Sequence, residues 1–179
     1  MNCWDVIEVD ADAGARQLVA SYADRLFGTA WRLCANASTA EDLVFRTLER
    51  AMTARDLRFP NEKAYFCWLC TILVNFYRQD MRLKGANALV FVETLPETED
   101  ERPDPGEEAC LNADRASVRE ALAALSPLLR EAAVLRYFED FSVPEIAEML
   151  GVPEGTVKFR LHEVRRKIRQ LLTQRLVMT

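Results

Sequence analysis

Residues 125–172 read LSPLLREAAVLRYFEDFSVPEIAEMLGVPEGTVKFRLHEVRRKIRQLL, and the boundaries of three successive helices are marked within them. Ser126 is a good N-cap residue, and Pro127 suits the first helical position. Ser142 and Glu145 have the spacing of a capping box, and Gly151 suits the left-handed position that ends a helix. The stretch therefore predicts two short helices and then a longer one that starts at Pro153.

The last predicted helix has one apolar stripe and one basic face. Its apolar residues recur at steps of four and three: Val157, Leu161, Val164, Ile168 and Leu171. This stripe is expected to pack on the preceding helices. Residues 157–175 hold seven Lys and Arg against a single acid, Glu163. A helix pair with a glycine turn and a basic second helix favours a helix-turn-helix motif that binds DNA, although a merely solvated basic helix has the same pattern.

The face opposite the apolar stripe, the residues that flank it and nearby arginines supply the candidate DNA contacts. They are Gly155, Thr156, Lys158, Phe159, Arg160, His162, Arg165 and Arg166. Lys158 and His162 can donate hydrogen bonds to base edges or phosphates, and Phe159 can contact a thymine methyl group. The arginines are better placed to bind phosphates, which position a protein without reading the base sequence.

The first half of the chain also predicts helices. Apolar residues recur at helical spacing within 15–35, and Ser38 and Glu41 have capping-box spacing ahead of a helix that ends near Arg55. In that second helix, Leu43, Val44, Thr47, Leu48, Ala51 and Met52 are expected to form the buried stripe. A third helix is expected from Glu62 to Lys84, after a loop over 56–61 that contains Pro60. Apart from the ambiguous segment 88–92 we find no strand pattern, so the predicted class is all-α.

Charge divides the chain of 179 residues, whose net charge is −5, into segments. Residues 93–114 hold nine acids and one base, together with prolines, which is typical of a solvated linker. We therefore expect an N-terminal extension (1–14), a helical domain (15–86), an acidic linker (87–112) and a second helical domain (113–179). The basic last helix is of the kind that lies against phosphates.

Several classes of function lack the residues that they need. With five irregularly spaced cysteines and a single histidine, the chain predicts no disulfide framework, and Cys67 and Cys70 find no matching pair of zinc ligands. We find no phosphate-binding glycine loop or catalytic triad, so neither an enzyme nor a metal or other cofactor is expected. No spanning helix or export signal is evident, and a cytoplasmic protein without membrane insertion is expected.

Residues 125–172 resemble the fourth conserved region of bacterial RNA polymerase sigma factors. Residues 19–84 resemble the second region, through AEDLVFRTLERA (40–51) and WLCTILVNFYRQDMR (68–82). With these two regions alone, the chain resembles extracytoplasmic-function (ECF) sigma factors over about four fifths of its length.

This resemblance implies that the first domain binds the β′ clamp helices of core RNA polymerase and melts the −10 promoter element. The second domain would then read the −35 element, next to the β flap. The implied polymerase contacts are Asp42, Phe45, Arg46, Glu49 and Arg50. The implied −10 and melting contacts are Arg58, Phe59, Lys63, Trp68, Asn75, Arg78 and Arg82. A further implied partner is an anti-sigma factor, which in this family can be membrane-bound.

The chain departs from the family pattern at four positions. The family usually has glutamine in place of Phe45, an acid near Arg46, aspartate in place of Gln79 and serine in place of Phe159. Two other functions stay open on the sequence: a sigma-like decoy that only binds an anti-sigma factor, and a helix-turn-helix repressor. The basic last helix argues against the decoy, and the aromatic and basic third helix is unexplained in a repressor.

Overall fold

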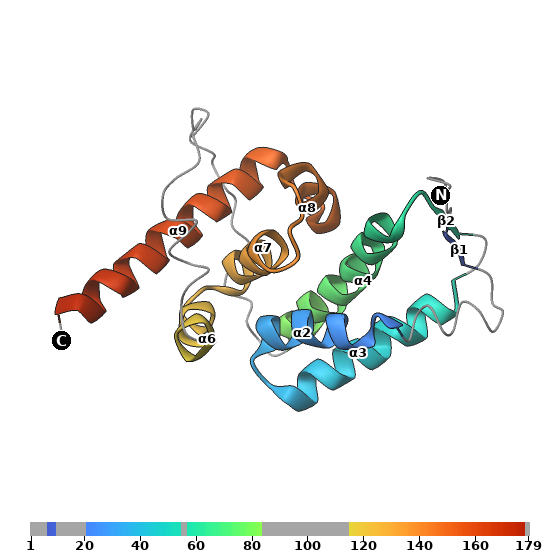
Figure 1. Cartoon of the computed structure of the whole chain (residues 1–179), viewed down its shortest axis with the longest axis horizontal. Coiled ribbons are helices and arrows are strands. Elements are labelled where there is room, and N and C mark those ends of the chain that lie inside the picture. The colour runs from blue at the N-terminus through green and yellow to red at the C-terminus, as the bar shows by residue number, and fades with distance from the viewer. Residues whose placement is uncertain (1–6, 10–20, 55–56, 84–114, 178–179) are drawn as a thin grey trace, which may run out of the picture. The chain divides into compact units, whose positions relative to one another are not determined.

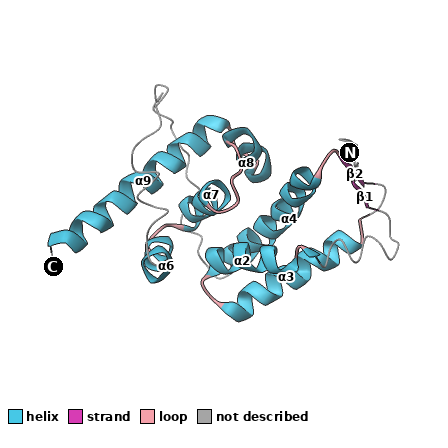
Figure 2. Cartoon of the chain, viewed as in Figure 1, coloured by secondary structure: helices cyan, strands magenta, loops and turns pink. Residues whose placement is uncertain are grey.

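The computed structural model describes residues 7–9, 21–54, 57–83 and 115–177, and the chain divides into two compact units, 1–90 and 91–179. Helices make up nearly all of the described chain, with two short strands beside them (Figure 2). The predicted all-α class with two helical parts is confirmed. The predicted domain limits at 14, 86 and 112 lie outside the described residues and stay predictions.

The first unit is built on three helices that pack on one another: α2 (Ala23–Cys34), α3 (Ala37–Met52) and α4 (Glu62–Leu83) (Figure 1). Their core consists of the apolar residues at helical spacing, including Leu26, Leu43 and Leu73, which are fully buried. The N-cap of α3 is Asn36, whose side-chain oxygen accepts a hydrogen bond from the backbone N–H of Thr39 at 2.9 Å. The predicted start at Ser38 is therefore wrong by one half-turn.

A small antiparallel sheet joins the start of the chain to the segment before α4. Strand β1 (Ile7–Val9) pairs with β2 (Leu57–Phe59), and Glu8 lies opposite Arg58 in the register. The prediction of a loop over 56–61 was therefore wrong at residues 57–59, and residues 7–9 of the predicted N-terminal extension pair with them. Strands of three residues are too short for alternation to identify them. The ambiguous segment 88–92 lies outside the described residues.

The second unit contains α6 (Arg115–Ala123), α7 (Pro127–Tyr137), α8 (Val143–Leu150) and α9 (Glu154–Val177). The predicted capping box is confirmed, because the Ser142 N–H donates to Glu145 Oε2 at 2.7 Å and Ser142 Oγ accepts from the Glu145 N–H at 3.5 Å. Gly151 ends α8 with a φ of 64°, as expected for the left-handed position. Helices α7 and α8 pack on α9 and bury Val157, Leu161 and Val164 of the predicted stripe.

Candidate nucleic-acid and polymerase interfaces

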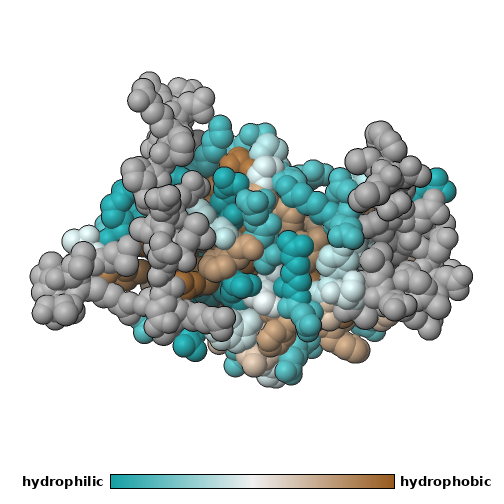
Figure 3. All heavy atoms as spheres, viewed as in Figure 1, coloured by the Kyte–Doolittle hydropathy of each residue, from teal (hydrophilic) through white to brown (hydrophobic). Residues whose placement is uncertain are grey.

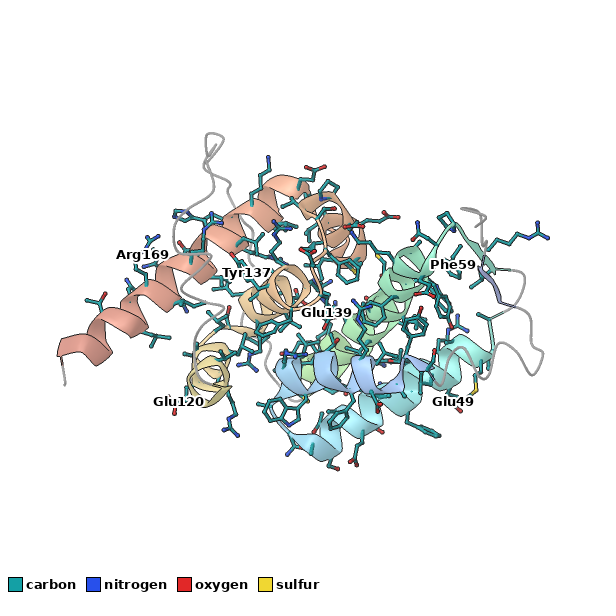
Figure 4. The ribbon with its side chains drawn as sticks, in the orientation of Figure 1. Glu49, Phe59, Glu120, Tyr137, Glu139 and Arg169 are labelled. Atoms are coloured by element: carbon teal, nitrogen blue, oxygen red, sulfur yellow. The ribbon has the colours of Figure 1, made fainter. Side chains whose placement is uncertain are left out.

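The helices α8 and α9 and the turn at Gly151 form the predicted helix-turn-helix. The apolar stripe of α9 faces α7 and α8, so the other face of its first turns is left toward solvent. On this face Gly155, Lys158 and Arg166 are exposed, and three further candidates are partly exposed: Phe159, His162 and Arg165. Six of the eight predicted DNA contacts thus lie where a ligand can reach them. Farther along the same helix, Figure 4 labels Arg169, which is also exposed.

The structure places Arg160 inside the second unit, so its predicted contact with phosphate is wrong for this arrangement. Its side chain is 8% exposed and its Nη1 lies 3.2 Å from Oε1 of Glu131, which is 1% exposed. This buried ion pair joins α7 to α9. Thr156 is also buried, and it offers DNA almost no side-chain surface. Both side chains thus lie inside the second unit instead of extending from α9.

Arg166 is held by a neighbour on the same helix. Its Nη2 donates to Glu163 Oε2 at 2.7 Å, and its Nε donates to Oε1 at 3.0 Å. The hydrogen bond from Arg166 lowers the pKa of the Glu163 carboxyl below its usual value. A charged Glu163 therefore orients the guanidinium of Arg166 and offsets part of its positive charge.

In the first unit an aromatic cluster packs around Phe59 on β2. The family resemblance implies that this residue contacts the melted −10 element. The ring of Phe59, on β2, lies 5.2 Å from Tyr65 and 5.4 Å from Trp68, both on α4. Tyr65 is fully buried, whereas Phe59 and Trp68 are partly exposed. Figure 4 labels Phe59 near the N-terminal end of α4. Tyr65 therefore supports two rings that remain accessible for stacking, which is how proteins hold unstacked bases.

The predicted −10 residues on α4 share one side of that helix. Trp68, Asn75 and Arg82 are seven residues apart, so they follow each other along one face. Asn75 and Arg82 are exposed and Arg78 is partly exposed. Toward the N-terminal end of α4, Lys63 and the preceding Arg58 on β2 are exposed as well. All seven predicted residues thus have accessible surface, with the basic groups placed to attract phosphates.

On α3, four of the five implied polymerase contacts are exposed: Asp42, Phe45, Glu49 and Arg50. Phe45 is 67% exposed, which is unusual for a large apolar side chain. Met52 was expected in the buried stripe, but it is 46% exposed and lies seven residues beyond Phe45 on the same face. The pattern could not identify it, because it lies at the edge of the stripe in the last turn. Arg46 is the exception among the five and turns toward α4, as described below.

Side chains of the described residues form no group of three or more His, Cys, Asp or Glu that could hold a metal ion. Cys70 is buried and Cys67 is partly exposed within α4. Among the helices that the structure describes, none combines the length and the apolar character that crossing a membrane requires.

On the face seen in Figure 3, hydrophilic residues cover most of the described surface and brown hydrophobic residues form smaller patches between them.

Comparisons with known proteins identify the family. A family described as sigma-70, region 4 matches residues 115–168, which run from α6 into α9. The ECF RNA polymerase sigma factor SigL of Mycobacterium tuberculosis is 32% identical over 160 residues, which cover 89% of this chain and 89% of SigL. This chain belongs to the ECF RNA polymerase sigma factors. The expectation from the resemblance is confirmed.

Two further proteins agree with this assignment. The ECF sigma factor SigE of Mycolicibacterium smegmatis is 35% identical over 162 residues, which cover 88% of this chain but only 61% of that relative. The fold is similar to that of the sigma factor RpoE of Bartonella quintana, solved in complex with the anti-sigma factor NepR. That similarity has a TM-score of 0.62 at 27% identity, and it covers 90% of this chain and 98% of RpoE.

Proposed function

We propose that this ECF sigma factor presents three separate surfaces, one to core RNA polymerase and two to promoter DNA. The exposed side of α3, with Phe45, binds the polymerase clamp. The face formed by β2 and α4 binds the −10 element, and the first turns of α9 read the −35 element. The chain acts by binding and positioning and carries out no chemical step of its own.

The observation that carries the proposal is the arrangement of charge at the start of α9. Lys158 is exposed on the first turns of the second helix of a helix-turn-helix, while Arg160 is bound internally to Glu131. In such motifs the N-terminal residues of the second helix contact base edges in the major groove. Lys158, Phe159 and His162 are therefore the residues that set the −35 preference, and Arg166 contacts the backbone.

Run-off transcription with purified core polymerase and a library of genomic promoter fragments tests this function. We expect the wild type to initiate from a subset of promoters and the Lys158→Ala/Arg166→Ala double variant to lose those transcripts by about tenfold or more. Glu148→Gln, an exposed change on α8 outside the proposed surfaces, is the control and should transcribe as the wild type does. A wild-type chain that neither binds polymerase nor initiates would overturn the proposal and leave the decoy or repressor.

We also infer an anti-sigma factor as a partner, supported by the complex in which the similar RpoE was solved. The apolar patch of Phe45 and Met52 on α3 is exposed in this chain. An inhibitor that covered it would keep polymerase away from the same surface.

A further inference from the structure

Arg46 makes all of its described polar contacts inside the first unit. Its Nη1 lies 2.9 Å from Oδ2 and 3.0 Å from Oδ1 of Asp80, on α4, and 3.2 Å from Oδ2 of Asp42, one turn earlier on α3. Its guanidinium carbon lies 4.4 Å from the centre of the Phe76 ring, also on α4. One side chain of α3 is thus bound to two side chains of α4.

The environment of this cluster favours a persistent contact. The side chains of Arg46 and Asp80 are 25% and 19% exposed, so solvent screens them less than it screens a surface pair. Burial by itself lowers the pKa of the Arg46 guanidinium, but hydrogen bonds to Asp80 and Asp42 outweigh burial and raise that pKa. The guanidinium stays charged, and its contact with the Phe76 ring adds a cation–π attraction.

The position of the cluster connects two of the proposed surfaces. Phe45 and Glu49, next to Arg46 and three residues beyond it, are exposed on α3 and face away from the core. On α4, Asn75 and Arg82 lie within five residues of Asp80 and are exposed on the proposed −10 face. This short, charged contact therefore links the helix that carries Phe45 to the helix that carries Asn75.

We infer that Arg46 and Asp80 form a positioning pair that couples polymerase binding on α3 to the orientation of the −10 face of α4. Arg46 acts within the chain and does not contact the polymerase, which corrects the role that the family resemblance implied. This inference deepens the proposed function and rests on it.

Transcription assays with saturating core polymerase test the coupling, on a promoter from which the wild type initiates. For Arg46→Gln and Asp80→Asn we expect the dissociation constant for core polymerase to stay within about threefold of the wild type. The rate of promoter opening should fall about fivefold for each, and the double variant should be no worse than either alone, because both changes remove one interaction. The loss should disappear on a template with a premelted −10 region.

Variants on the same elements make the test specific. Arg50→Gln removes one exposed positive charge from α3 and should weaken polymerase binding without slowing the opening of complexes that have formed. Arg46→Lys keeps the charge and should open promoters faster than Arg46→Gln does. The exchange Arg46→Asp/Asp80→Arg should open promoters faster than Arg46→Asp alone or Asp80→Arg alone.

Two outcomes would overturn the inference. One is a loss of polymerase affinity in Arg46→Gln with normal opening at saturation, which would make Arg46 a polymerase contact. The other is additive losses in the double variant with no recovery in the exchange. If the wild type fails to initiate at all, the proposed function fails instead. Thermal unfolding of the wild type, Arg46→Gln, Asp80→Asn and their double variant would still measure whether Arg46 and Asp80 are coupled in the free chain.

Discussion

The hydroxyl group of Tyr65 is buried, and its oxygen has no hydrogen-bond partner within the described part of the chain. Its ring is nevertheless in contact with Phe59, Trp68 and Tyr22. The ring therefore contributes packing, while the hydroxyl loses its hydration on folding without compensation. Burial raises the pKa of the Tyr65 hydroxyl to about 12.

Tyr65→Phe keeps the aromatic cluster and removes that uncompensated hydroxyl. We expect the free energy of unfolding at pH 7 to rise by up to about 1 kcal/mol, because an unpaired buried polar group is replaced by an apolar edge. Urea denaturation followed by circular dichroism measures this difference. A decrease in stability would show that the hydroxyl is hydrogen-bonded in solution.

The same variant should change the dependence of stability on alkaline pH. Because the pKa is higher in the folded chain than in the unfolded chain, ionisation favours the unfolded state once pH passes the ordinary value of about 10. Below about pH 10 the hydroxyl is neutral in both states and the free energy of unfolding does not depend on its ionisation. As pH rises from about 10 toward about 12, the hydroxyl ionises in the unfolded chain first, and the free energy of unfolding falls. Between these values the stability of the wild type should fall more steeply than that of Tyr65→Phe, and equal slopes would contradict the assignment.

Between elements, the pair of Glu131 on α7 and Arg160 on α9 is the most deeply buried ion pair that the structure describes. Removing one partner leaves the other charge buried without compensation, which typically costs about 3–5 kcal/mol. We expect Glu131→Gln to lower the stability of the second unit by about 3 kcal/mol and to weaken promoter binding, since α9 loses the ion pair that helps to fix it against α7. Thermal unfolding and DNA binding in the presence of polymerase measure the two effects.

Replacement of both charges separates this contact from general damage. Glu131→Leu/Arg160→Met should recover most of the lost stability, because an apolar pair of similar volume carries no desolvation cost. Glu148→Gln, on the exposed side of α8, should stay within about 0.5 kcal/mol of the wild type. A double variant as unstable as the single one would mean that packing, not charge, dominates at this site.

The elements that the sequence predicted well are those with local signals. The capping box at Ser142, the turn at Gly151 and the apolar stripe of α9 depend on residues within a few positions of each other. Arg160 could not be assigned in this way, because its partner Glu131 lies 29 residues earlier. Helical geometry places Arg160 at the border of the apolar stripe of α9. Only the packing of α7 against α9 decides whether its side chain lies in the core or in solvent. The short pairing of β1 and β2 was missed for the same reason.

The departures from the family pattern on α3 and α4 show a similar limit. The family resemblance marks Arg46 as unusual because an acid is expected near it, and Gln79 as unusual because aspartate is expected there. The structure shows that Arg46 binds Asp80, which directly follows Gln79. The acid and base of this contact come from different helices, so neither position is understandable alone.

At the scale of the whole chain, each of the two units has its own buried core. The helix contacts of the first unit involve α2, α3 and α4, and those of the second involve α7, α8 and α9. We expect calorimetry of the full chain to show two unfolding transitions. Tyr65→Phe should shift one of them and Glu131→Gln the other, whereas one transition shifted by both variants would mean that the units unfold cooperatively.

The pairing of β1 with β2 bears on how this protein is handled in the laboratory. A purification tag fused just ahead of Ile7 is attached to the strand that pairs with the segment of Arg58 and Phe59. A tag at the other end follows α9, which continues for about five helical turns beyond Lys158. Protein prepared for promoter-opening assays should therefore carry its tag at the C-terminus, or have an N-terminal tag removed.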